Sequence, residues 1–227
     1  SKEDDLISFA KMWASYHEVK QNAIVYPEAY ENLMKNMRKR VDKEEFFPFL
    51  DYLSFDWLVP SDIERYLLVI HRLASSYRWN RSVRRYPISV LSHTFLITFF
   101  TYLIAREVDI WESESTDMLL TALFHDIPEA ITGDIITPTK KSFPWLEASI
   151  EKIEQEMVHE NLIAYISSFS FAPIFERKML TPWSESHGKL VKKADILSAL
   201  HEARIEAPYS EDFQEVYEKM KEKLEIV

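Results

Sequence analysis

The sequence of 227 residues contains no cysteine and only two glycines, Gly133 and Gly188. The absence of cysteine excludes disulfides, thiolate-bound zinc and a cysteine nucleophile, and it fits a reducing compartment. Two glycines are too few for the glycine-rich loops with which P-loop and dinucleotide-binding proteins hold phosphates. We therefore expect any chemistry to rest on histidine, carboxylate and basic side chains.

Basic charge is also scarce, since the formal net charge is −10. A nucleic-acid polymer is therefore not an expected partner, although a small basic pocket for one phosphate remains compatible with this charge. The first residues, SKEDDLISFAKMW, are acidic and lack a signal-peptide pattern, so we expect a cytoplasmic protein. Ile88–Ala105 has no charge over 18 residues, but it carries His93 and several hydroxyl groups. This stretch predicts a buried helix, and we expect no membrane partner.

Strand-like alternation is nearly absent, whereas apolar residues recur at helical spacing, which predicts an all-α fold. Residues 1–60 are expected to form an N-terminal helical extension packed on a main body of residues 61–227. Ser61 and Glu64 have the spacing of a capping box that opens the first helix of that body. Other helices are expected at 4–19, 27–40, 44–52, 88–105, 145–166, 189–206 and 210–224. We expect a polar break at Glu112–Thr116 and irregular structure over Ser167–His187.

The stretch LLTALFHDIPEAITGDIITP, residues 119–138, ends an apolar run with the doublet His125-Asp126. Pro128 lacks an N–H, and its ring would clash with the carbonyl four residues earlier in a helix, so the helix should kink or stop near Ile127. The doublet then offers a nitrogen and an oxygen to one cation at a helix end. Glu129 and Asp134 follow closely as further acidic candidates.

Two distant residues can complete a metal site with this doublet. His93 lies on the uncharged helix, and Asp195 lies on an otherwise apolar helix in LVKKADILSAL, where an unpaired carboxylate is costly. Two imidazoles and two carboxylates leave open positions on one divalent ion, which is typical of catalysis. The ion could be Co, Mn, Zn, Fe, Ni or Mg. Alternatively, His93 is a core histidine and Asp195 pairs with a neighbouring lysine.

The order His93, His125-Asp126 and Asp195 on helices resembles the HD superfamily of metal-dependent phosphohydrolases, over about residues 77–206. The stretch HDIPEAITGDIITPTK, together with Arg78-Trp79 fifteen and fourteen residues before His93, resembles the bacterial 5′-deoxynucleotidases of that superfamily. This resemblance implies an HD-domain helical bundle that hydrolyses deoxyribonucleoside 5′-monophosphates to nucleoside and phosphate. By analogy it also implies a homodimer.

The resemblance further implies roles for individual residues. Arg78 would hold the phosphate, and Trp79 would crowd the 2′ position of the sugar. Glu129 and Asp134 would take the two acidic catalytic positions. One departure is Ser92, because the family usually has Glu directly before the first metal histidine.

Other interpretations stay open at this point. The chain could be an HD phosphodiesterase or triphosphohydrolase acting on another phosphoester. It could also be a non-catalytic nucleotide-binding regulatory module, an alternative for which Ser92 and the extension leave room. Arg78 could be a surface cation and Trp79 a packing residue, while Glu129 and Asp134 could serve as caps or turn residues. The remaining arginines of the segment RWNRSVRRYP, which are Arg81, Arg84 and Arg85, are expected in a solvated basic loop.

Overall fold

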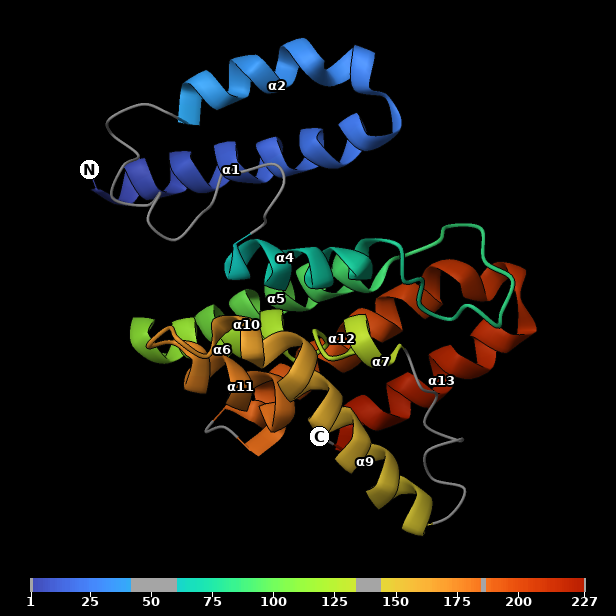
Figure 1. Cartoon of the computed structure of the whole chain (residues 1–227). Coiled ribbons are helices and arrows are strands. Elements are labelled where there is room, and N and C mark those ends of the chain that lie inside the picture. The colour runs from blue at the N-terminus through green and yellow to red at the C-terminus, as the bar shows by residue number, and fades with distance from the viewer. Residues whose placement is uncertain (1, 42–60, 134–143, 185–186, 227) are drawn as a thin grey trace. The chain divides into compact units, whose positions relative to one another are not determined.

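The structure, a computed structural model, describes residues 2–41, 61–133, 144–184 and 187–226 (Figure 1). Within these ranges every regular element is a helix, and an isolated antiparallel bridge joins Tyr77 to Ser89. The prediction of an all-α fold is therefore confirmed. The chain divides into two compact units, Ser1–Glu64 and Arg65–Val227.

In the first unit, α1 (Lys2–Val25) and α2 (Pro27–Val41) form a helical hairpin (Figure 1). Tyr16, Val19 and Met37 are buried together between them. Because these side chains follow the helical period, the sequence predicted both helices, although α1 is longer than expected. The helix expected at 44–52 lies outside the described residues. That this segment is an extension packed on the main body stays a prediction.

The helix α4 (Asp62–His71) begins at the predicted capping box. The backbone N–H of Glu64 donates to Ser61 Oγ at 3.3 Å, and the backbone N–H of Ser61 donates to Glu64 Oε2 at 3.1 Å. Two backbone donors that no helical carbonyl can satisfy are thus paired at the start of the helix. The 3₁₀ turn η2 (Arg72–Ala74) follows and ends the helical run before Ser76.

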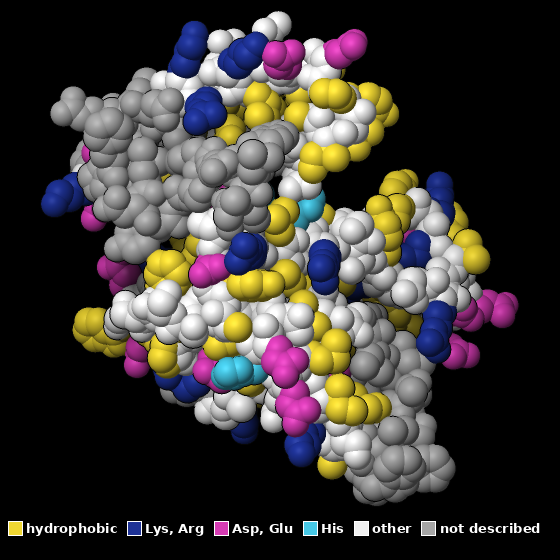
Figure 2. Space-filling model, in the orientation of Figure 1, with side chains coloured by type: hydrophobic (Ala, Val, Ile, Leu, Met, Phe, Trp, Pro, Cys, Tyr) yellow, Lys and Arg dark blue, Asp and Glu magenta, His cyan; other side chains and the backbone are white. Residues whose placement is uncertain are grey.

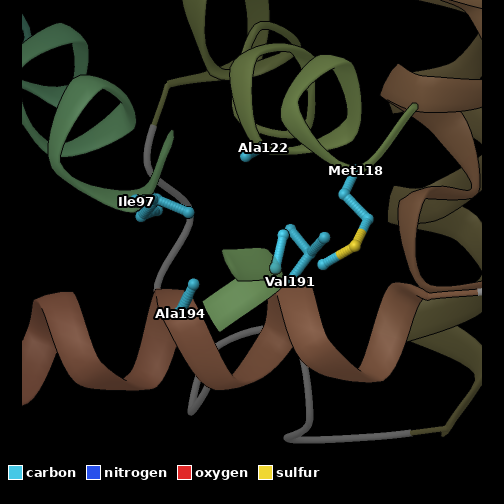
Figure 3. Packing of buried hydrophobic residues seen from close by; sticks show 6 residues of the cluster. Ile97, Met118, Ala122, Val191 and Ala194 are labelled. Carbon is cyan, nitrogen blue, oxygen red and sulfur yellow. The ribbon is translucent and has the colours of Figure 1, made fainter. Parts of the chain in front are cut away.

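The core of the second unit lies between α5 (Val90–Glu107), α6 (Glu112–Phe124) and α12 (Gly188–Glu206). Figure 3 shows side chains from these helices pointing toward one another. The buried cluster consists of Ile97, Ala105, Met118, Ala122, Val191 and Ala194. Full burial of a side chain such as Ile97 or Met118 contributes roughly 1.5–3 kcal/mol. This packing fixes α5 and α12, which carry His93 and Asp195, and α6, whose end leads into the His125-Asp126 doublet.

The C-terminal half contains more helix than the sequence predicted. The expected helix 145–166 is present as α9 (Pro144–Val158), a π-helical turn η3 (His159–Ile163) and α10 (Ala164–Ile166). The prediction of irregular structure after it is wrong, because α11 (Ala172–Leu180) forms there with Pro173 in its first turn. Proline is tolerated at that position, since the first N–H groups of a helix have no helical partner.

The predicted polar break at Glu112–Thr116 is also wrong, because α6 begins at Glu112. Glu112 and Glu114 lie in its first turn, where negative charge interacts favourably with the helix dipole. On the same helix, Asp117 Oδ2 accepts a hydrogen bond of 2.6 Å from the wholly buried ammonium of Lys178 on α11. The last helix, α13 (Glu211–Ile226), packs on α12 through Met220 and Ile196.

The helix α5, which carries no charge before Arg106, buries one face only. His93 and Ile97 are fully buried, whereas Phe95 is 73% exposed on the other side. None of the described helices has the length and apolar character needed to cross a bilayer. Figure 2 shows one face of the molecule, on which basic, acidic and apolar side chains alternate over short distances.

Candidate active site

The His125-Asp126 doublet lies directly after α6. Phe124 ends the helix, and a turn through Pro128 leads into α7 (Glu129–Thr132), so the prediction of a helix end close to Ile127 is confirmed. His125 Nδ1 lies 2.8 Å from the carbonyl oxygen of Ala122 and donates to it. This bond leaves His125 Nε2 deprotonated in the neutral ring, 3.1 Å from Asp126 Oδ1 and available as a ligand.

His93 reaches the doublet from α5. Its Nε2 lies 3.7 Å from Asp126 Oδ2, and one ligand atom from each of His93, His125 and Asp126 lies within 4.8 Å of the others. Both Nε2 atoms and Asp126 Oδ2 are buried without a hydrogen-bond partner among the described residues. Leaving such polar atoms unsatisfied is costly, and a divalent cation bound by imidazole and carboxylate would satisfy all three. These residues therefore fit a metal ion.

Asp195 lies beside this cluster on α12. Its Oδ1 is 3.3 Å from His93 Nε2, while its Oδ2 accepts a hydrogen bond of 2.6 Å from Lys192 Nζ. Burial raises the pKa of Asp195, but His93 and Lys192 lower it further than burial raises it, so the carboxylate is anionic. Asp195 thus pairs with Lys192 through one oxygen and lies beside the metal-ligand candidate His93 with the other. Its role as a fourth ligand stays a prediction.

Arg78 also lies close to Asp126. Its Nη1 is 4.0 Å from Asp126 Oδ2, and its side chain is 16% exposed. Burial lowers the pKa of Arg78, but the carboxylates Glu202, Asp126, Asp195 and Glu129 together raise it above its usual value. The guanidinium is therefore a permanent cation beside the candidate metal site, with N–H donors suited to an anion.

Trp79 is held against the protein by its ring and its N–H. Its Nε1 donates to Glu202 Oε2 at 3.1 Å, and its ring meets Phe213 of α13 edge-on at 5.9 Å between centroids. Its backbone φ is +55°, in the left-handed region that non-glycine residues rarely occupy. Trp79 is therefore a packing residue as well as a candidate substrate contact.

The expectation that Arg84 lies in a solvated basic loop is wrong. Only 6% of its side chain is exposed, and its Nη1 lies 3.4 Å from Glu202 Oε2 while its Nε lies 3.8 Å from Glu206 Oε1. Arg81 and Arg85 are exposed as expected. Glu206 further accepts hydrogen bonds of 3.0 Å from the backbone N–H groups of Arg85 and Tyr86.

Two further carboxylates at the site, Glu202 and Glu206, are almost fully buried and were not predicted from the sequence. They lie on α12 with Asp195 and Ser198 at intervals of three, four and four residues, which places all of them along one helix face. A polar stripe of this kind on an otherwise apolar helix is the signal that could have identified them.

For the other residues predicted at the site, fewer contacts with the metal cluster are described. Glu129 opens α7, is partly buried, and acts electrostatically on Arg78. Asp134 lies outside the described residues, so its role stays a prediction. Ser92 is exposed, and its backbone N–H donates to Ser89 Oγ at 3.1 Å, so it takes part in the cap of α5.

The fold is that of the HD-domain proteins. An HD-domain phosphohydrolase from Listeria innocua superposes with a TM-score of 0.56 and 22% identity over 70% of this chain and 77% of that one. A protein of Pyrococcus horikoshii superposes with a TM-score of 0.54 and 23% identity over 70% of this chain and 87% of that one.

Sequence comparison narrows this class to one family. Residues 65–227 match the family model described as 5′-deoxynucleotidase YfbR-like. A 5′-deoxynucleotidase yfbR from Photorhabdus temperata is 32% identical over 138 residues, which are 57% of this chain and 67% of that protein. The chain therefore belongs to the YfbR-like 5′-deoxynucleotidase family, and it is a hydrolytic enzyme. The resemblance found in the sequence is confirmed.

Proposed function

We propose that this protein hydrolyses nucleoside 5′-monophosphates to nucleoside and phosphate, with deoxyribonucleotides preferred. We further propose that His93, His125, Asp126 and Asp195 hold one divalent cation. The observation that supports this most is the meeting of two unsatisfied imidazole nitrogens and a carboxylate with the Arg78 guanidinium, 4.0 Å from Asp126. A metal-binding cluster next to a partly buried cation is suited to a phosphate group, which carries two negative charges.

The residues of the site have two kinds of role, which are binding of the substrate and transfer of protons. A divalent cation bound by these residues would neutralise phosphoryl oxygens and lower the pKa of water, which contributes several kcal/mol to phosphate chemistry. The Arg78 guanidinium donates N–H groups to the phosphate oxygens and orients the phosphorus for attack. The Trp79 indole lies next along the chain, where it crowds a ribose 2′-hydroxyl.

Proton transfer is assigned to the acidic residues that follow the doublet. Glu129 accepts a proton from the attacking water. At the same time the water oxygen forms a bond to phosphorus, and the bond from phosphorus to the 5′ oxygen breaks. The leaving 5′ oxygen needs a proton, and Asp134 is our candidate to provide it. The homodimer implied by the resemblance also stays a prediction.

Phosphate release tests this function directly. Wild-type protein is assayed with deoxyribonucleoside and ribonucleoside 5′-monophosphates and with Co²⁺, Mn²⁺ or Mg²⁺. We expect turnover with at least one metal, and a loss of about 10²-fold or more in kcat for Asp126→Ala and for Glu129→Ala. Equal activity in the wild type and both variants would remove the mechanism.

A second pair of variants separates this function from action on other phosphoesters. Trp79→Ala should lower the preference for deoxyribose by admitting ribonucleotides, while Arg78→Ala should raise KM for both sugars. Arg81→Ala is the matched control, since Arg81 is exposed in the same segment. Faster hydrolysis of a phosphodiester or a triphosphate by the wild type would contradict the proposal.

A further inference from the structure

Glu202 lies where the metal cluster and the Arg78-Trp79 pair meet. Its Oε1 is 2.8 Å from His93 Nδ1, and its Oε2 accepts a hydrogen bond of 3.1 Å from Trp79 Nε1. The side chain is fully buried on α12. One carboxylate therefore contacts a candidate metal ligand with one oxygen and a candidate substrate contact with the other.

The described polar contacts of this carboxylate are all with donors. Besides His93 and Trp79, the guanidinium of Arg84 lies 3.4 Å from Oε2 and that of Arg78 lies 3.6 Å from Oε1. A carboxylate accepts from several donors at once, whereas an amide of the same size accepts at one end only. The surroundings of Glu202 thus require an anion and not merely a polar side chain.

The contact with His93 also selects a tautomer. A hydrogen on His93 Nδ1 that points at Glu202 leaves Nε2 deprotonated in the neutral ring, and Nε2 faces Asp126 and Asp195 at 3.7 and 3.3 Å. Metal-binding histidines in general donate their second ring N–H to a carboxylate or carbonyl, which orients the ring. For His125 the corresponding acceptor is the carbonyl of Ala122.

We propose that Glu202 is a positioning residue that orients the metal ligand His93 and the indole of Trp79 together. The inference rests on the proposed function, because it assumes that His93 binds the ion and that Trp79 meets the sugar. Through this one side chain, the geometry of the metal site and the selectivity for the sugar depend on each other. Glu202 itself acts on substrate only through these two residues.

The variant Glu202→Gln keeps the size of the side chain but replaces one acceptor oxygen by an NH₂ group. That group must face either His93 or Trp79, both of which donate. We expect the Kd of Mn²⁺ alone, measured by titration calorimetry, to rise by about 10–100-fold. We also expect the indole N–H resonance of Trp79, assigned by its loss in Trp79→Phe, to move and to exchange faster with water.

Glu206→Gln is the matched control. Glu206 lies one helical turn further along α12 and faces Arg84 as well, but its described hydrogen bonds go to the backbone of Arg85 and Tyr86. We expect this variant to bind Mn²⁺ within about twofold of the wild type, because none of the described hydrogen bonds and ion pairs of Glu206 reaches His93 or Trp79. An equal loss of Mn²⁺ affinity in both variants would indicate general unfolding and overturn the proposal.

The wild type provides a test that does not depend on how well a variant folds. In protein with ¹⁵N-labelled histidine and bound Zn²⁺, we expect His93 to coordinate through Nε2 and to keep a slowly exchanging hydrogen on Nδ1. Coordination through Nδ1 would overturn the proposal, as would Glu202→Gln with unchanged Mn²⁺ affinity or an unchanged Trp79 resonance. These measurements need no turnover, so a wild type without nucleotidase activity would contradict the proposed function alone.

Discussion

The cluster His93, His125 and Asp126 and the loop of residues 78–86 lie along the same helix, α12, but they are held in different ways. The cluster is carried by α5 and by the end of α6, and both helices pack on α12 through side chains such as Ile97 and Ala122. The loop is held by hydrogen bonds and ion pairs to Glu202 and Glu206.

Because they are held in different ways, the cluster and the loop should respond differently to substitutions. Apolar packing is spread over many contacts, so the helices that carry the cluster are positioned by the core as a whole. The loop depends on two buried carboxylates, and removing the Arg84 cation that they share leaves their negative charge less well compensated. We therefore expect changes in the cluster to act on metal binding and catalysis, and the loss of Arg84, which anchors the loop, to act mainly on stability.

The largest effect is expected from His125→Ala. The change removes a ligand atom, so Mn²⁺ affinity and kcat/KM should both fall by about 10³-fold or more. His201→Ala is the matched control, because His201 is an exposed histidine of α12. Calorimetric titration with Mn²⁺ and phosphate release measure the two quantities. If His125→Ala keeps wild-type affinity, the cluster is a structural feature and not a metal site.

A smaller effect, on folding, is expected from Arg84→Met. This substitution keeps a long apolar side chain but leaves Glu202 and Glu206 without their shared cation, and it should lower the free energy of unfolding by about 3 kcal/mol. Urea denaturation measures it. Arg81→Met, in the exposed part of the same segment, should stay within about 0.5 kcal/mol of the wild type. Equal stability of the two variants would show that the loop is not anchored by these carboxylates.

The smallest effect is expected from Ser198→Ala. Ser198 Oγ lies 2.9 Å from His93 Nδ1, on the same nitrogen as Glu202. Because the carboxylate remains, Mn²⁺ affinity should fall by only about threefold, the size of one neutral hydrogen bond. A titration that shows a loss as large as that of Glu202→Gln would assign the orientation of His93 to the hydroxyl group instead.

Local patterns in the sequence were enough to predict much of the secondary structure of this protein. The helical spacing of apolar residues predicted the all-α fold, and Ser61 with Glu64 predicted where α4 begins. Pro128 predicted that α6 ends close to the His125-Asp126 doublet, because proline is incompatible with a helix interior. Each of these effects acts over a few residues, so each is visible without knowledge of the fold.

The sequence by itself therefore determined most of the helices, the His-Asp motif and the family. Only the tertiary structure decided how Arg84 and Trp79 are anchored, since Glu202 lies 118 and 123 residues away from them. It also decided that Lys178 is buried against Asp117, 61 residues away. A charged side chain looks the same in the sequence whether it faces water or a distant partner. Its burial is favourable only once folding brings the opposite charge within reach.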